Sequence, residues 1–301
     1  MCKILYNSRD VDWWNIGAEI KHFNINDYHS IEIDDNNYVK VMEVYESLNL
    51  PQYIGYAKFK CKEIGPVLYR GQANIYKKMS PSLFRGLSNQ NNCGRRRGRL
   101  KKLIENLRKH KVFMKSTEEF AYEPLLQHYG VNTEYIDVVD NIWSALWFAT
   151  HSAVVCGKNK EYVTYIENLN EYCYILMLQF GKYIENSGGF SNYNTDKGYH
   201  VVDLRMGANS LYRRPHAQHG LLAKKQRPSL DYSDSVVGIL RINTKNALSW
   251  IGNTPLMQTS FMFPSAFYDK GYSLFLESDK ILEENKSLYD DVTGRIQIIM
   301  P

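Results

Sequence analysis

Three apolar runs of the β type constrain the fold most strongly: PVLYR at residues 66–70, CYILMLQF at 173–180 and SVVGILRI at 235–242. Short runs rich in β-branched and aromatic residues favour buried strands. Patterns of helical periodicity fill much of the chain between the first run and the second. Strands and helices that mix in this way predict an α+β fold with a mixed or antiparallel β core flanked by helices.

Four stretches have the apolar spacing of amphipathic helices: residues 37–49, about 99–114, 116–130 and 142–156. Ser116 and Glu119 have the spacing of a capping box at the start of the third stretch. Asp140 or Asn141 is placed to cap the fourth. A loop-rich stretch follows at 186–200, and a weak helical pattern, DKILEENKSL, lies near the end of the chain.

The order of these patterns predicts one compact domain in three parts. Residues 1–65 are expected to form an N-terminal helical appendage, residues 66–243 the core, and residues 244–301 a C-terminal cap of the same domain. A chain of 301 residues is long enough to bury a sizeable core in this arrangement.

The positive charge is concentrated in one segment. Residues 95–111 hold nine Lys or Arg and one Glu, which gives this segment a formal charge of +8 in a chain whose total is +5. Such a cluster attracts phosphate-bearing partners, although a solvated helix face has the same pattern. The candidate nucleic-acid contacts are Arg95, Arg96, Arg97, Arg99, Lys101 and Lys102.

Several classes of protein find no support in the sequence. No stretch approaches the run of about 18 apolar residues that crosses a bilayer, and the first residues reach acidic side chains before a signal-peptide core forms. The five cysteines are isolated, without a CxxC pair, so they indicate neither a disulfide framework nor a zinc site. We expect a cytoplasmic protein with no membrane partner and no bound metal.

Four short motifs occur in a characteristic order: YRGQ at 69–72, PSLFR at 81–85, LLQHYG at 125–130 with ID and ALWFA after it, and RPHAQHGLL at 214–222. Together they resemble the FRG domain, a family named for its aromatic-Arg-Gly motif. The resemblance covers about residues 66–222, and SFMFPSAF at 260–267 resembles a closing segment of the family. Glu134 stands where an arginine is usual, Val138 replaces a tryptophan, and Ser265 replaces an aspartate.

The layout of these motifs is also similar to that of ADP-ribosyltransferases, in which a strand-end Arg or His holds NAD and a later Glu or Gln orients the ribose. This resemblance implies NAD as a substrate, Arg70 on a phosphate or ribose and Gln218 in the later role. Tyr129 or Tyr69 would stack on nicotinamide, and His128 would act as a base or a donor. The candidate ligand-binding residues are Tyr69, Gly71, Gln72, Arg85, Asp137, Arg213, Arg214 and His219.

Each of these residues also has a structural interpretation. Arg70 could cap strand ends or pair with Asp137. Gln218 could be a buried amide that bonds to the backbone, and an amide cannot accept a proton. A histidine at a helix end, such as His128, often satisfies the carbonyls of the last turn.

Three functions are consistent with the sequence. The first is an effector that binds NAD or another phosphate-bearing ligand and transfers or hydrolyses ADP-ribose, as a toxin or in defence against phage. It would act on a protein target or be inhibited by a neutralising partner. The second is a nucleic-acid-binding or sensing module without catalysis, and the third is a metal-dependent nuclease built on Glu123, Asp137 and Asp140.

Overall fold

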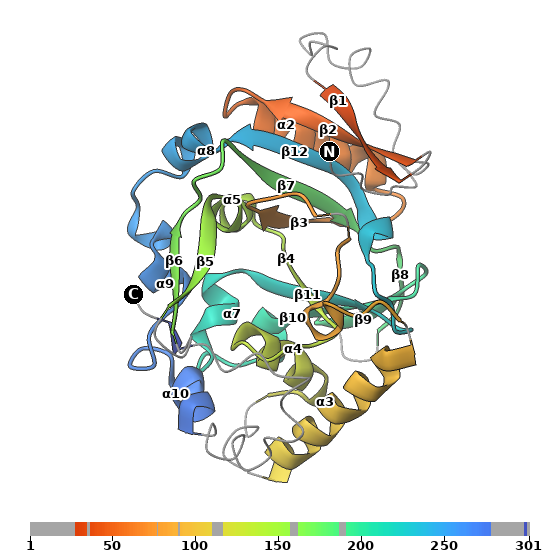
Figure 1. The fold of residues 1–301 in the computed structure, drawn as a ribbon, viewed down its shortest axis with the longest axis vertical. Coiled ribbons are helices and arrows are strands. Elements are labelled where there is room, and N and C mark those ends of the chain that lie inside the picture. Colours follow the sequence, from red (N-terminus) through yellow and green to blue (C-terminus); the bar gives the residue numbers. More distant parts are fainter. Residues whose placement is uncertain are drawn as a thin grey trace.

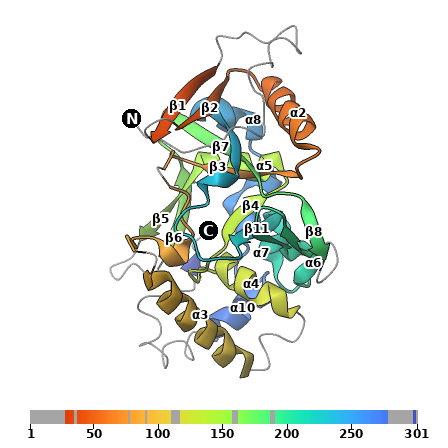
Figure 2. The ribbon, with the colours of Figure 1, turned by 90° about the vertical axis from the view of Figure 1, so that its right-hand side faces the viewer.

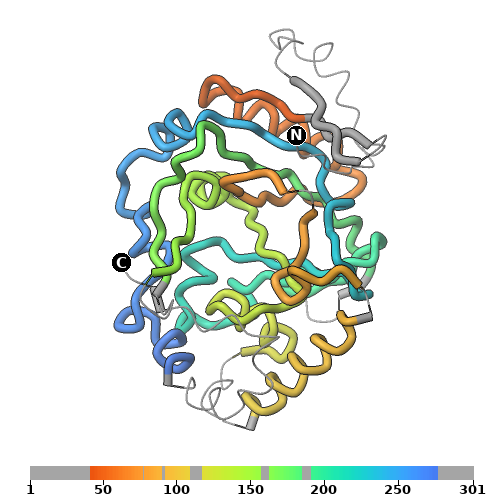
Figure 3. Tube along the Cα trace, in the orientation of Figure 1, coloured from red at the N-terminus to blue at the C-terminus, as the bar shows by residue number. Residues whose placement is uncertain are grey.

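The computed structural model describes residues 28–34, 37–76, 78–89, 91–109, 117–156, 162–186, 191–277 and 298–299. Figure 3 traces the path of the chain. Within these residues the fold is an α+β domain with one large mixed sheet. The predicted α+β class with a mixed β core is confirmed.

The large sheet has ten strands in the described part of the chain, in the order β1-β2-β12-β7-β3-β4-β11-β10-β9-β8. One neighbouring pair, β12 with β2, is parallel, and the others are antiparallel. The strands are β1 (Tyr28–Asp34), β2 (Asn37–Val44), β3 (Val67–Gln72), β4 (Ile136–Val139), β7 (Tyr172–Gln179), β8 (Tyr183–Asn186), β9 (Asn192–Thr195), β10 (Tyr199–Asp203), β11 (Gly220–Lys225) and β12 (Val236–Asn243).

The sheet is interrupted at its centre, between β3 and β4. These strands pair at one position, Tyr69 with Val139, whereas β3 pairs with β7 along its whole length. In Figure 1, β12, β7 and β3 lie above, β11 and β10 lie below, and β4 crosses between the two groups. Beyond this single pair, β3 and β4 are not paired with each other.

Helices cover both halves of the sheet. Figures 1 and 2 place α2 at one end of the molecule and α3 at the other, with α5 beside β3. The α-helices are α2 (Asn49–Cys61), α3 (Asn91–Lys109), α4 (Tyr122–His128), α5 (Ile142–Thr150), α6 (Leu204–Gly207), α7 (Arg213–Ala217), α8 (Thr244–Ile251), α9 (Thr259–Met262) and α10 (Lys270–Glu277). Short 3-10 turns occupy η4 (Ser82–Phe84), η5 (Glu119–Ala121), η6 (Ser233–Ser235) and η7 (Pro255–Met257).

A second sheet lies beside the first. It contains β5 (His151–Cys156), β6 (Tyr162–Glu167) and the short β13 (Ile298–Ile299), in the order β13-β6-β5. β5 and β6 pair antiparallel over their full lengths. This hairpin starts directly at the end of α5 and carries Tyr165 toward the centre of the molecule.

Local signals explain several of these elements. The side chain of Asn141 accepts hydrogen bonds from the backbone N–H groups of Trp143 and Ser144, so the predicted cap of α5 is confirmed. Leu100, Leu103 and Leu107 form the buried stripe of α3, as their spacing predicts. The strand predictions at 66–70, 173–180 and 235–242 correspond to β3, β7 and β12.

The helix predicted at 37–49 is wrong, because residues 37–44 form strand β2. Val41 packs into one hydrophobic cluster, while Met42 and Val44 pack into another. A strand buried on both faces has apolar residues without strict alternation, which can imitate helical spacing. The helix of this region is α2, which starts at Asn49. Strands β1 and β2 both join the main sheet, so residues 1–65, which were expected to be a helical appendage, contribute two strands as well as a helix. The domain boundaries stay predictions.

Three further expectations differ from the structure. The helix predicted at 142–156 ends at Thr150, because Val154 and Val155 continue as β5 and pair with β6. The basic helix begins at Asn91 instead of about residue 99. The stretch expected to be loop-rich contains β9 and the start of β10, which pair antiparallel.

Two predictions fall outside the described residues: the capping box that begins at Ser116 and the weak helix at 279–288. No helix in the described part of the chain is both long enough and apolar enough to cross a membrane.

Candidate functional site

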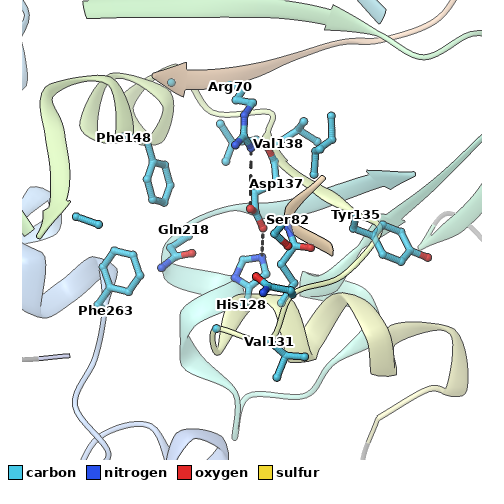
Figure 4. A pocket seen from close by; sticks show the side chains of 18 of the residues that line it. Arg70, Ser82, His128, Val131, Tyr135, Asp137, Val138, Phe148, Gln218 and Phe263 are labelled. Carbon is cyan, nitrogen blue, oxygen red and sulfur yellow. Dashed lines mark hydrogen bonds and ion pairs between the residues drawn. The ribbon is translucent and has the colours of Figure 1, made fainter. Parts of the chain in front are cut away.

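A cavity of about 390 Å³ occupies the space where β3 and β4 diverge. It is lined by residues from β3, β4, α4, α5 and β11, and by the segments around η4 and α9. In Figure 4, Arg70, Asp137, His128 and Gln218 surround its polar part, and Phe148 and Phe263 stand at its other side. The four motifs of the sequence therefore meet at one cavity.

Arg70 bridges the gap between the two diverging strands. Its Nη1 atom donates a hydrogen bond to the backbone carbonyl of Asp137 at 2.6 Å, and the same atom lies 3.9 Å from Oδ2 of the Asp137 carboxylate. Burial lowers the pKa of Arg70, and Arg85 adds to this effect, whereas Asp137 opposes it. Since an arginine keeps its proton in proteins, a positive charge stands in the cavity wall.

His128 ends α4 and has a side chain that is 3% exposed. Neither ring nitrogen meets the geometry of a full hydrogen bond within the described structure, although Nε2 lies 3.9 Å from Oδ1 of Asp137 and the Gln218 side chain interacts with the ring closely enough to raise its pKa. Burial lowers the pKa of His128, Asp137 raises it by a smaller amount, and the nearby Arg214 lowers it further. The ring is therefore neutral at pH 7 and holds one donor and one acceptor against the cavity.

Asp137 lies between these two groups on β4. Its side chain is 49% exposed, much more than that of Arg70 at 19% or that of His128. Asp137 is the polar residue among the four of β4 that line the cavity, and its neighbours Ile136, Val138 and Val139 are buried. The ion pair of Arg70 with Asp137 thus faces an open space and is not sealed in the core.

Gln218 follows α7 and is 4% exposed. Its Nε2 atom donates a hydrogen bond to the backbone carbonyl of Met262 at 2.7 Å, and its backbone N–H bonds to the carbonyl of Arg214 at 3.0 Å. The amide group therefore ties the third motif to the C-terminal segment that carries Phe263.

Aromatic side chains form the apolar side of the cavity. Phe148 comes from α5, Tyr165 from β6, and Phe263 follows α9. The rings of Tyr165 and Phe263 stack at a centroid distance of 4.2 Å, and Phe148 meets Phe263 edge-on at 6.3 Å. One side of the cavity is thus suited to a flat apolar group and the other to an anion.

Gly220 makes room for the histidine. A Cβ atom at this position would lie 2.5 Å from Cε1 and 2.7 Å from Nε2 of His128. The glycine after His219 therefore lets the start of β11 pass directly under the His128 ring. His219 itself adopts a left-handed backbone conformation, with φ of 54°.

The structure places the sequence-predicted residues in two groups. Arg70, His128 and Gln218 line the cavity, as do Tyr69, Gly71, Arg85 and Asp137. Tyr129, Gln72, Arg213, Arg214 and His219 are not among the lining residues. The hydroxyl of Tyr69 is buried without a hydrogen-bond partner in the described structure, and burial raises its pKa.

Tyr129 and Arg214 belong to a buried layer behind the cavity. The Tyr129 ring stacks on Phe275 at 4.4 Å, and its hydroxyl donates to Oδ2 of Asp269 at 2.7 Å. The Arg214 guanidinium lies over the rings of Tyr272 and Tyr129, at 3.9 and 4.7 Å, and donates to the carbonyl of His128 at 3.3 Å. Arg214 thus holds the end of α4 from behind.

The remaining predicted ligand residues lie at the surface or beside other groups. Arg213 is exposed. The ring of His219 lies between Asn141 and Arg205, with contacts of 3.2 Å to each. Arg205 in turn pairs with Asp203 at 2.6 Å and with Asp140 at 2.8 Å.

Glu134, which stands where the family usually has arginine, does not line the cavity. Its carboxylate is buried and accepts two hydrogen bonds from Arg97 of α3. Arg97 of the basic helix therefore neutralises Glu134, which adds no negative charge to the cavity wall.

The basic helix α3 uses some of its cations within the fold. Arg96 donates to the carbonyl oxygens of Leu83 and Arg85, at 2.7 and 3.1 Å, and Arg97 pairs with Glu134. Arg99 is half-buried, whereas Arg95, Lys101 and Lys102 are exposed. The six candidate nucleic-acid contacts therefore divide into residues that hold α3 in place and residues that face solvent.

Within the residues that the structure describes, there is no group of three or more His, Cys, Asp or Glu side chains that could bind a metal ion. Glu123 bonds to Lys224 at 2.8 Å and is not a cavity residue, while Asp140 pairs with Arg205. The three acidic residues of the nuclease hypothesis thus have separate partners.

Fold and site together define an α+β protein with an arginine-lined cavity at a break in its central sheet. Residues 65–155 match the family model of the FRG domain. No curated protein and no solved structure matches the chain. Tyr165, Gln218 and Phe263 line the cavity from outside the matched range.

Sequence reasoning missed the aromatic side of the cavity. Phe148 lies inside the ALWFA motif and Phe263 inside SFMFPSAF, so the motifs held a signal for both. Tyr165 follows no motif, and it reaches the cavity because the β5–β6 hairpin folds back from α5. Ser80 and Tyr135 also line the cavity and lie outside the four motifs, whereas Ser82 lies inside PSLFR.

Proposed function

We propose that the cavity binds NAD or a related phosphate-bearing nucleotide, and that the protein hydrolyses or transfers ADP-ribose. The observation that carries this proposal is the pairing of an arginine side with an aromatic side in one cavity. A dinucleotide has the matching parts, because it joins flat heteroaromatic rings to a pyrophosphate.

Arg70 and Arg85 supply the positive side. A guanidinium binds phosphate oxygens through two N–H groups at once, which makes arginine well suited to pyrophosphate. Arg70 is held by the backbone carbonyl of Asp137 through Nη1, and this bond fixes the side chain before a ligand arrives. A fixed donor loses less side-chain entropy on binding than a free one.

Phe148 and Phe263 supply the surface for a ring. The cavity volume of about 390 Å³ falls within the range of about 300–1,000 Å³ that is usual for small-molecule sites. It is large enough to hold a nucleoside and its first phosphates. The nicotinamide ring would lie against the aromatic side, with the ribose next to Asp137 and His128.

The reaction class follows from the ligand. Cleavage of the bond between nicotinamide and ribose passes through an oxocarbenium-like state, which a nearby negative charge stabilises. An enzyme that consumes NAD inside a cell would act as a toxin or as a defence effector against phage. Such an enzyme would need a neutralising partner or a trigger.

Release of nicotinamide from NAD tests the proposal. Purified protein is incubated with NAD, with and without protein or nucleic-acid acceptors, and free nicotinamide is measured. We expect release by the wild type and at least a 10-fold loss in Arg70→Ala, since charged hydrogen bonds contribute about 1.5–3 kcal/mol. Arg213→Ala, which removes an exposed arginine outside the cavity, serves as the matched control. No release under any condition would contradict the proposal.

A second candidate function is nucleic-acid binding through α3, either with or without catalysis. The observation that favours it is the exposure of Arg95, Lys101 and Lys102 on one helix. This helix also contacts the cavity wall, because Arg96 donates a hydrogen bond to the backbone carbonyl of the cavity residue Arg85. Phosphate contacts of this kind weaken steeply as salt rises. Lys101→Glu with Lys102→Glu should abolish binding of a fluorescent oligonucleotide at low salt. Equal affinity in the variant and the wild type would exclude α3 as the interface.

A further inference from the structure

We propose that Asp137 is the proton acceptor of the site, a role that the amide group of Gln218 cannot fill. This inference rests on the proposed function and names the group that activates the attacking hydroxyl. Three observations carry it: the composition of the cavity wall, the hydrogen bonding of Gln218 and the setting of the Asp137 carboxylate.

Asp137 is the only carboxylate among the described residues that line the cavity. Glu123, Glu134 and Asp140 are close in sequence, but each has another partner and none lines the cavity. Asp269 is buried behind the cavity, where it accepts hydrogen bonds from Tyr129 and from two backbone N–H groups. A carboxylate that faces a ligand in this cavity therefore has to come from β4.

The side chain of Gln218 has a structural role. Its amide nitrogen bonds to the carbonyl of Met262, so the side chain secures the segment that carries Phe263. An amide oxygen cannot take up a proton at neutral pH. The third motif thus closes the cavity and positions an aromatic wall, and the chemistry needs a different residue.

The surroundings of the Asp137 carboxylate leave it able to accept a proton from a ligand. It is half exposed, with Oδ2 at 3.9 Å from Arg70 and Oδ1 at 3.9 Å from His128. Both distances exceed a hydrogen bond, so the two oxygens keep acceptor capacity for a ligand hydroxyl. Because burial keeps His128 neutral, the ring does not bind Asp137 as a fixed ion pair.

In the step that we propose, the bond between C1′ of the ribose and the nicotinamide nitrogen breaks, and nicotinamide leaves with both electrons. The oxygen of water or of an acceptor hydroxyl forms the new bond to C1′. Its proton passes to a carboxylate oxygen of Asp137, which later returns it to solvent. The products are nicotinamide and ADP-ribose, free or attached to the acceptor, and no redox partner is needed.

The test compares three variants in nicotinamide release and in ADP-ribose affinity. Asp137→Asn should slow release at least about 100-fold, as expected for loss of a general base, with ADP-ribose affinity within about 3-fold of wild type. Arg70 keeps its bond to the backbone carbonyl in this variant, so the cavity should persist. Asp140→Asn, which alters a neighbouring carboxylate outside the cavity, should keep the wild-type rate.

Asp137→Ala gives a second readout that a structural role would not produce. Added formate can enter the space of the missing side chain and should restore part of the rate. The inference fails if the wild type releases nicotinamide and Asp137→Asn does so at the same rate, or if formate does not accelerate Asp137→Ala. The proposed function itself fails if the wild type releases none, so the two failures are distinguishable.

Discussion

Gly71 and Ala145 are in such close contact that a Cβ atom on Gly71 would stand 1.9 Å from the Ala145 carbonyl oxygen. The same atom would lie 2.6 Å from the backbone nitrogen of Ala149. The glycine after Arg70 therefore lets α5 lie directly on β3. Because α5 also carries Phe148, this contact sets the distance between the arginine side and the aromatic side of the cavity.

Gly71→Ala should move α5 away from β3 and destabilise the protein by roughly 3 kcal/mol or more, because backbone atoms cannot yield as a flexible side chain can. Chemical denaturation measures the change. Gly94→Ala on α3 is the matched control, since nothing lies within 4 Å of its added Cβ atom. That change should stabilise α3 by about 0.5–1 kcal/mol. Equal stability of Gly71→Ala and the wild type would show that the close contact is absent.

The pair formed by Arg97 and Glu134 predicts the outcome of a charge exchange. Glu134→Arg restores the residue that is usual in the family, but it places a second cation against Arg97 at a buried position. We expect this variant to lose roughly 3 kcal/mol or more of its free energy of unfolding. Arg97→Glu combined with Glu134→Arg should recover at least half of that loss. A double variant as unstable as the sum of both single changes would contradict the pairing.

Stability should decline in mild acid because of His200. Burial, with help from Lys224, lowers the pKa of His200 to about 4. Its Nδ1 accepts from the Tyr135 hydroxyl at 2.8 Å, and Nε2 faces the amide oxygen of Asn192, which suits the neutral ring. In the unfolded chain the His200 ring takes up a proton near pH 6.5, whereas in the folded protein it does so only near pH 4. The stabilisation that depends on the neutral ring is therefore complete above pH 6.5 and is lost as the pH falls toward about 4.

Over this pH range, the protonation of His200 should lower the free energy of unfolding by at most about 3 kcal/mol. Urea denaturation at several pH values measures it, and His200→Gln should flatten the dependence. Part of the slope should persist, because burial also lowers the pKa values of His128 and His151. An unchanged slope in His200→Gln would show that another group causes the acid sensitivity.

The sequence was sufficient for the elements whose signals are local. β3, β7 and β12 are short apolar runs, and the cap at Asn141 and the stripe of α3 depend on neighbours within one or two turns. The prediction at 37–49 failed because β2 takes its conformation from β12, which follows almost 200 residues later. The end of α5 was missed for a similar reason, since β5 exists by pairing with β6.

The site was predictable in part. The motifs pointed to Arg70, His128, Asp137 and Gln218, all of which line the cavity. What no motif could show is the bond that each side chain makes across the fold. Arg70 bonds to a backbone carbonyl on the next strand, Gln218 bonds to Met262, and Arg97 neutralises Glu134. These contacts join distant segments, so they depend on the tertiary structure.

The binding of ADP-ribose, measured by titration calorimetry with the wild type and with Arg70→Ala, tests the central claim most directly. The account predicts saturable binding with one site per chain, and an affinity at least about 10-fold lower in a variant whose melting temperature stays close to that of the wild type. Undiminished affinity in Arg70→Ala, or no saturable binding of ADP-ribose to the wild type, would contradict it.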